Sequence, residues 1–164
     1  MRKLMLGLAG VVMLSTFAVA QDKASQKFIT EAIEGNFAEV SMGELAQKNG
    51  QGAEVKTFGQ MLASDHGAAL QEAKTIATSL GVTPPANPNA KQKADYDKMA
   101  KLNGAAFDKS FAQHMIMDHK KDIAAYRKAS KAKDAAGQYA QKTLPTLQKH
   151  LETAQSIQRQ SRTR

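Results

Sequence analysis

The chain has 164 residues, enough for one ordinary domain, and 42% of them are hydrophobic. It contains no cysteine, so disulfides are excluded and stability must come from a packed core. The formal net charge of +8 is spread along the chain and only 5% of residues are aromatic, which argues against the dense basic stripe of a nucleic-acid-binding protein.

Residues 1–20 have the pattern of a bacterial signal peptide. A basic pair, Arg2 and Lys3, precedes an almost wholly apolar run that ends in Ala18-Val19-Ala20, the small-x-small pattern read by signal peptidase. We therefore expect cleavage between Ala20 and Gln21. An uncleaved N-terminal membrane anchor is the alternative, but the run is short for a span and polar residues follow it at once.

The mature chain is expected to be one helical-bundle domain over 21–164, with its core at about 26–159. Losing Arg2 and Lys3 lowers the formal charge from +8 to +6. No second apolar run follows, so we expect no transmembrane segment in the mature chain, and a location in the periplasm or outside the cell. A basic surface could meet an anionic envelope polymer or a protein partner, or it could simply be solvated.

Helix-forming residues dominate the mature chain, while valine and isoleucine are sparse, which favours an all-α protein. The apolar periodicity predicts four long helices, with a short one between the second and the third. In chain order the predicted helices cover 26–48, 53–80, 90–102, 106–131 and 135–159.

The breaks between these helices indicate how the chain is connected. Asn49-Gly50-Gln51-Gly52 is short, so the first two long helices should be antiparallel neighbours. The segment 81–89 contains three prolines and ends the second helix, and Lys133-Asp134 marks a tight turn before the last. Hairpin, long crossover and hairpin is the order of a ferritin-like four-helix bundle, here with a short extra helix in the crossover.

Three of the four histidines lie at the centre of apolar helix stripes, and we therefore expect them to face the core. The neighbours that define the stripes are Leu62 and Leu70 for His66, Met115 and Ile123 for His119, and Leu147 and Ile157 for His150.

The first helix adds a carboxylate, because Glu39 is the only charge on a stripe of small and apolar residues. A buried carboxylate is costly unless it is paired or binds a metal. Counted from the turns, Glu39, His66, His119 and His150 all fall near mid-bundle. This set predicts one divalent transition-metal ion, such as zinc, iron or copper.

Two aspartates, Asp65 and Asp118, each directly precede a core histidine. They lie about 100° round the helix from it, so we expect them to orient the histidine ligands by accepting hydrogen bonds rather than to bind the ion themselves. The alternative to a metal is a buried His–Asp–Glu hydrogen-bond network that fixes the packing without an ion.

His114, Met115 and Met117 are candidates for a second, softer metal site, because thioethers favour copper(I). The alternative is that these methionines simply fill the core.

A set of short segments extends from the first long helix to the last. They are Ala38-Glu39-Val40, Met42-Gly43, Leu45-Ala46, Val55, Phe58, Met61, Asp65-His66, Gly104 to Asp108, Asp118-His119, Thr143-Leu144-Pro145, Leu147 and His150. Together these segments resemble the bacterial family named domain of unknown function 4142. The resemblance implies an exported protein with a ferritin-like four-helix bundle and no established activity.

An enzyme is the least favoured class. Di-iron bundles carry Glu-x-x-His on two helices, but here Ala63 and Ile116 occupy the positions three residues before His66 and His119. A single ion is therefore expected rather than a di-iron centre. The chain shows no nucleophile elbow or phosphate loop, and four protein ligands would leave a metal no open position for catalysis.

Overall fold

The structure is a computed structural model that describes the backbone of residues 11–161 and the side chains of residues 22–161. Within this part of the chain it has five helices: α1 (Val11–Asn49), α2 (Ala53–Ser79), α3 (Ala90–Met99), α4 (Gly104–Ala129) and α5 (Ala135–Gln160). The prediction of an all-helical bundle with a short third helix between two pairs of long helices is confirmed. Apart from the start of α1, the helix ends differ from the predicted ones by at most three residues.

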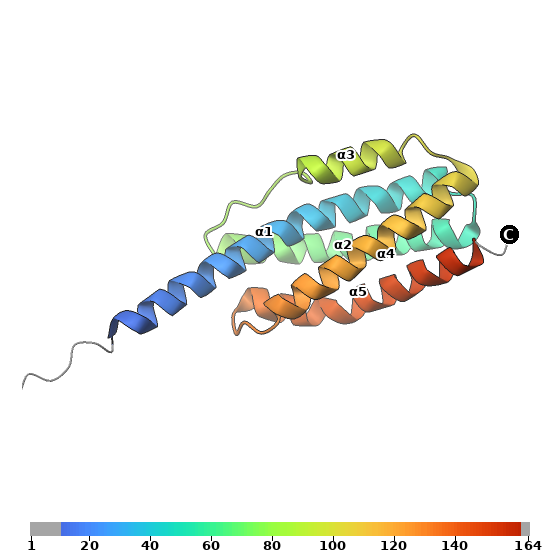
Figure 1. Ribbon diagram of the computed structural model, residues 1–164. Helices are drawn as coiled ribbons and strands as arrows, with labels where there is room; N and C mark the ends of the chain where they lie inside the picture. The colour runs from blue at the N-terminus through green and yellow to red at the C-terminus, as the bar shows by residue number, and fades with distance from the viewer. Residues whose placement is uncertain (1–10, 162–164) are drawn as a thin grey trace, which may run out of the picture.

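The predicted signal peptide lies partly outside the described residues, which begin at Val11. From Val11 onward the backbone is helical, and the first turns of α1 project beyond the other helices (Figure 1). The predicted cleavage point after Ala20 therefore falls inside α1. The signal peptide itself stays a prediction.

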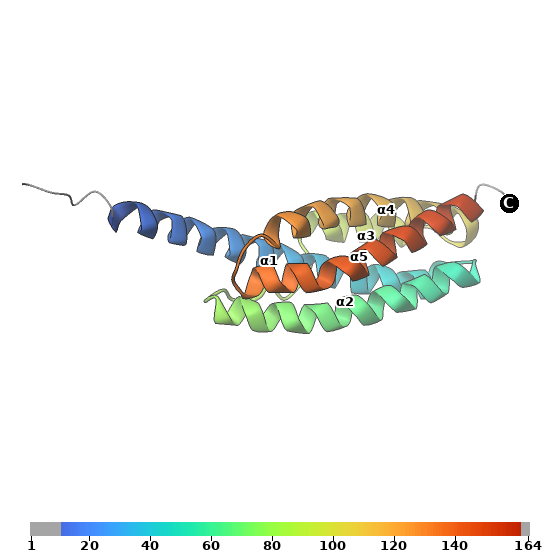
Figure 2. The ribbon, with the colours of Figure 1, turned by 90° about the horizontal axis from the view of Figure 1, so that it is seen from below.

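The four long helices form two antiparallel hairpins that pack side by side (Figures 1 and 2). The first hairpin is α1 with α2, and the second is α4 with α5. The long connection that carries α3 returns the chain to the other end, so α4 runs parallel to α2 and antiparallel to α1 (Figure 1). In consequence α1 also packs against α4, and α2 against α5, while α3 lies outside, against α1 and α4.

Two glycines set how closely α1 and α2 approach each other. A Cβ atom added at Gly59 would lie 2.5 Å from the carbonyl oxygen of Gly43 and 2.8 Å from the Cβ of Ala46. A Cβ at Gly43 would likewise lie 2.5 Å from the carbonyl oxygen of Gly59. Only glycine fits at this crossing, so these two residues fix the spacing and the rotation of the first hairpin.

The turn between α1 and α2 is tied to the second hairpin by one carboxylate. The two oxygens of Asp108, on α4, accept hydrogen bonds from the backbone N–H groups of Gln51 and Gly52, at 2.9 and 2.8 Å. These contacts satisfy two of the backbone donors that a turn and a helix start leave unpaired.

The core consists of two apolar clusters with a polar layer between them. The turn-side cluster, near the α1–α2 turn, contains Met42, Val55, Phe58, Leu62, Phe107, Phe111 and Met115 among its members. The far cluster, towards the opposite end, contains Ile29, Ile33, Leu70, Ala73, Ile123, Tyr126, Tyr139 and Leu147. Between them lie five buried polar residues: Asn36, Glu39, His66, His119 and His150. None of the helices in the described part of the chain is long and apolar enough to span a membrane.

Candidate metal centre

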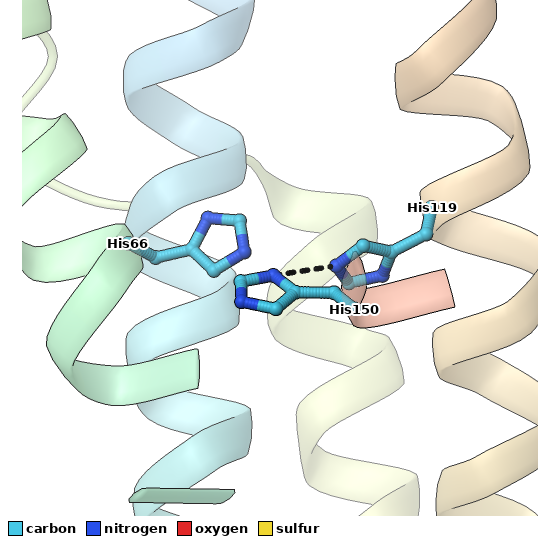
Figure 3. A group of neighbouring side chains, drawn as sticks. All are labelled: His66, His119 and His150. Carbon is cyan, nitrogen blue, oxygen red and sulfur yellow. Dashed lines mark hydrogen bonds between the residues drawn. The ribbon is translucent and has the colours of Figure 1, made fainter. Parts of the chain in front are cut away.

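Three histidines from three helices meet in the polar layer. His66 on α2 is 5% exposed, and His119 on α4 and His150 on α5 are fully buried. The ring centroids are 5.8 Å apart for His66 and His119, and 5.3 Å apart for the other two pairs. One nitrogen from each ring lies within 4.8 Å of the other two, and the rings turn these nitrogens towards one another (Figure 3). The predicted orientation of the three histidines towards the core is confirmed.

The outward nitrogens of His119 and His150 each face an oxygen. The Nδ1 of His119 lies 3.0 Å from the carbonyl oxygen of Met115, one turn earlier on α4. The Nε2 of His150 lies 2.9 Å from a carboxylate oxygen of Asp65, on α2. Carbonyl and carboxylate oxygens only accept hydrogen bonds, so both outward nitrogens must carry the proton. The inward nitrogen of each neutral ring therefore carries no proton and presents a lone pair.

A relay of side chains fixes the third ring in the same way. The hydroxyl of Tyr139 donates to the carbonyl oxygen of Ala69 at 3.3 Å, and it accepts from the amide nitrogen of Asn36 at 3.0 Å. The amide oxygen of Asn36 then faces the Nδ1 of His66 at 2.8 Å, so this nitrogen donates. The Nε2 of His66 therefore presents a lone pair. This nitrogen is buried and has no hydrogen-bond partner among the described residues.

The result is a buried cluster of three lone pairs, referred to below as the three-histidine cluster (His66, His119 and His150). The Nε2 of His119 and the Nδ1 of His150 lie 3.3 Å apart, within hydrogen-bond distance (Figure 3), but with both outward nitrogens protonated neither inward nitrogen of the neutral rings has a proton to donate. Two lone pairs at that distance repel unless a positive species lies between them. Histidines that bind metals commonly donate their other N–H to a carboxylate or a carbonyl, which is the pattern found at all three rings.

A proton is a poor occupant of this cluster. Burial, and after it the neighbouring His150, lowers the pKa of His119 to about 4. Burial followed by the two other rings lowers the pKa of His66 well below its usual value. Burial also lowers the pKa of His150, although the adjacent Asp65 opposes this. The rings are therefore neutral at pH 7, which is the form that coordinates a metal.

Glu39 lies beside the cluster, on the outer side of one ring. Its Oε1 is 4.0 Å from the Nδ1 of His119, the nitrogen that points away from the other two rings. Its Oε2 is buried and has no hydrogen-bond partner among the described residues. Burial, followed by repulsion from Asp122 and Asp118, raises the pKa of Glu39 well above its usual value. Glu39 as a fourth ligand stays a prediction.

Of the two aspartates predicted to accept hydrogen bonds from the core histidines, one contacts a histidine of the cluster and the other does not. Asp65 reaches across from α2 to His150, whereas Asp118 pairs with His114, at 3.2 Å, on the same helix. His114, Met115 and Met117 do not converge, because Met115 is fully buried in the core while Met117 is 56% exposed.

Sequence reasoning missed two polar residues of the layer. Asn36, 2% exposed, and the hydroxyl of Tyr139 hold His66 in place, yet neither stood out as a site residue. A signal for Asn36 was present, because it lies between Ile33 and Val40 on the apolar side of α1. An amide among apolar residues on a buried face usually has a specific hydrogen-bond partner.

A pocket of about 220 Å³ opens between α1, α3 and α4 and reaches the polar layer. Its lining includes Asn36, Glu39 and His66 at the inner end, and Asp95 on α3 and Asp118 and Asp122 on α4 towards the surface. Burial, and after it Asp118, raises the pKa of Asp122 to about 6. The pocket therefore brings several carboxyl groups close to one of the three histidines.

Comparison with known proteins shows a match to one protein family over most of the chain. The profile of a family described as "Domain of unknown function (DUF4142)" matches residues 14–157. No curated protein and no solved structure matches the chain.

Proposed function

The chain belongs to the DUF4142 family, and from that premise and the chemistry of its core we propose that it is an exported protein that binds one divalent transition-metal ion through His66, His119 and His150. The observation that carries the proposal is the convergence of three nitrogen lone pairs whose outward N–H groups already have acceptors. An ion at their centre replaces the repulsion between His119 and His150 by coordination and satisfies the unpaired Nε2 of His66.

The donor set favours zinc, iron or copper, because neutral imidazole suits all three ions. Three histidines leave a fourth position for a water molecule or for Glu39, after rotation of its side chain. A single ion fits better than a di-iron centre, because Ala63 and Ile116 stand where the Glu-x-x-His motif requires carboxylates.

The order of the helices supports a ferritin-like arrangement. The first hairpin, the long crossover and the second hairpin give helix directions in which α1 and α5 run one way and α2 and α4 the other (Figure 1). This pattern supports the proposal of a ferritin-like bundle, a class in which metal sites are built from side chains of facing helices.

The basic n-region, the apolar run and Ala18-Val19-Ala20 support export and residence in the periplasm or elsewhere in the cell envelope. In that compartment a protein without cysteine gains no disulfide, and a bound ion is one way to stabilise a small bundle.

A second candidate function is supported by a different observation. Asp65, His150 and His119 already lie in series at 2.9 and 3.3 Å, and one extra proton held between the two rings, against the lowering of their pKa values by burial, would make a metal-free network. Under this reading the protein is a non-catalytic envelope protein whose polar layer fixes the packing, and its basic surface meets an anionic envelope polymer or a protein partner.

Metal content separates the two functions. Untagged mature protein from a periplasmic extract, never exposed to a chelator, is analysed by mass spectrometry for bound metals beside His119→Ala and His114→Ala. We expect about one equivalent of metal in the wild type and in His114→Ala, whose histidine pairs with Asp118 outside the cluster, and none in His119→Ala. A wild type free of metal would leave the structural network as the better function.

A further inference from the structure

The pocket between α1, α3 and α4 concentrates acid on a basic protein. Six carboxyl groups line it, against two lysines, although the chain as a whole has a formal charge of +8. The carboxyl groups belong to Glu31, Glu34, Glu39, Asp95, Asp118 and Asp122. A cleft lined by one sign of charge raises the local concentration of oppositely charged ions.

The carboxylates continue from the surface to the polar layer. The side chain of Asp118 is 38% exposed, Asp122 is partly buried, and Glu39 is 4% exposed at the inner end, where His66 also lines the pocket. A cation moving inward thus meets carboxyl groups near the surface, part of the way in and at the inner end of the same pocket. Such ligands replace the waters that the ion must shed before it enters the core.

Two buried residues that carry an unpaired polar atom both line this pocket. Among the described residues, the buried side-chain polar atoms without a partner are the Oε2 of Glu39 and the Nε2 of His66, and both residues line it. Buried polar groups without a partner are rare and mark an ion, a water or a functional role. One atom belongs to a carboxyl group and the other to an imidazole ring, and both groups bind metals in their deprotonated form.

The second pocket among the described residues does not offer a comparable path. A second pocket, between α4 and α5, is lined by Lys120, Arg127 and Glu152 among others, and by none of the three histidines. On the α2–α5 side Asp65 is 40% exposed, but it contacts the outward nitrogen of His150, which carries the proton. The acidic pocket thus combines open space, negative charge and an unpaired histidine nitrogen, which neither the second pocket nor the surface at Asp65 does.

We propose that the acidic pocket is the access route of the metal site, in which Asp118, Asp122 and Glu39 bind a hydrated divalent cation in turn and pass it to the three-histidine cluster. This inference rests on the proposed metal site. The carboxylates supply charge and oxygen ligands along the path, and the histidines supply the final nitrogen ligands. Because the route acts on the rate of binding, it can be tested separately from the final affinity.

Cobalt(II) is a suitable probe, because its visible absorption changes when nitrogen ligands replace water. Association is followed by stopped flow on metal-free mature protein, and the Kd is measured by competition. The variant is Asp118→Asn with Asp122→Asn, which keeps the size of both side chains and removes their charge. The matched control is Glu152→Gln, an acidic residue that lines the second pocket. Thermal melts confirm that each variant is folded.

We expect the double variant to associate at least about tenfold more slowly than the wild type, with a Kd changed much less because dissociation slows too. Glu152→Gln should keep the wild-type rate, and added salt should slow the wild type towards the double variant. An unchanged rate in the double variant, or slowing in Asp65→Asn instead, overturns the route and leaves the metal site standing. If the wild type and His119→Ala give the same cobalt spectrum, there is no metal site at the three histidines, and both the metal site and the route are overturned.

Discussion

The two apolar clusters and the polar layer between them are built on different rules. In the turn-side cluster Phe58 and Phe111 pack edge to face at 5.9 Å, and in the far cluster Phe28 and Tyr126 do so at 4.9 Å. These contacts need only shape and volume to match. In the polar layer, by contrast, each nitrogen of His66, His119 and His150 has its own role, because one donates outward and the other is a lone pair.

This difference shows where a substitution is tolerated. A cluster held by shape accepts another apolar side chain of similar volume, whereas the polar layer fails when one donor or acceptor is lost. The helix crossing at Gly43 and Gly59 also depends on shape, but it is as sensitive to substitution as the polar layer, because one added carbon atom at either glycine would overlap the other helix.

The largest effect is expected from metal removal, which acts on the polar layer alone. With free ion at a thousand times its Kd, binding stabilises the folded state by about 4 kcal/mol. For a domain of this size we expect the midpoint of thermal unfolding to fall by roughly 10–15 °C when excess EDTA is added to the zinc-loaded protein. His119→Ala should melt at one temperature with or without EDTA. Coincident wild-type melts would contradict the metal site.

The helix crossing can be tested with one substitution at two places on α2. Gly59→Ala places a Cβ against the backbone of Gly43, so we expect a loss of about 1–3 kcal/mol in the free energy of unfolding. A Cβ atom added at Gly67 has no neighbour within 4 Å. Gly67→Ala should therefore raise the free energy of unfolding by about 0.5–1 kcal/mol, because alanine is the better helix former. Guanidinium unfolding of both variants gives the comparison. Equal effects would mean that the crossing is looser than described.

Acid should weaken the metal-free protein through the polar layer. The usual pKa of histidine is about 6.5 and that of His119 in the folded protein is about 4, so between these values only the unfolded chain binds the proton. The stability that His119 contributes is present above pH 6.5 and is lost as the pH falls, by about 2 kcal/mol between pH 7.5 and 5.

Denaturant unfolding at the two pH values, with chelator present, measures this loss in the wild type and in His119→Asn. Asp122 acts in the opposite direction, because its raised pKa of about 6 lets the folded state bind a proton first, but it is common to both proteins. The wild type should therefore lose about 2 kcal/mol more than the variant. Parallel pH profiles would show that His119 titrates normally.

The smallest effect concerns the partly exposed acceptor of His150. Asp65→Ala should weaken metal binding about tenfold, because the ring loses the group that orients it. The stability of the metal-free protein should change by only about 0.5 kcal/mol, because Asp65 is 40% exposed and water can replace its carboxylate as the acceptor for His150. Asp65→Asn keeps an oxygen acceptor and should recover part of the affinity. Titration with zinc measures both. An affinity equal to the wild type in Asp65→Ala would mean that other contacts hold the ring.

Much of the fold followed from the sequence, because apolar periodicity and glycine breaks fix helices and turns locally. The inward orientation of His66, His119 and His150 followed from the same periodicity. The periodicity did not predict on which side of His119 Glu39 would lie. It also did not predict the hydrogen bonds that link Tyr139 and Asn36 to His66. They depend on the rotation of α1 against its neighbours, which the contact between Gly43 and Gly59 sets across the interface rather than along the chain.

The three-histidine cluster also straddles the seam between the two hairpins. His66 belongs to the α1–α2 hairpin, and His119 and His150 belong to the α4–α5 hairpin. An ion held by all three would therefore act as a cross-link, since the hairpins could no longer separate without breaking coordinate bonds. In a chain without cysteine, the middle of the bundle is then the place where the two halves are fastened, and metal supply would decide how tightly.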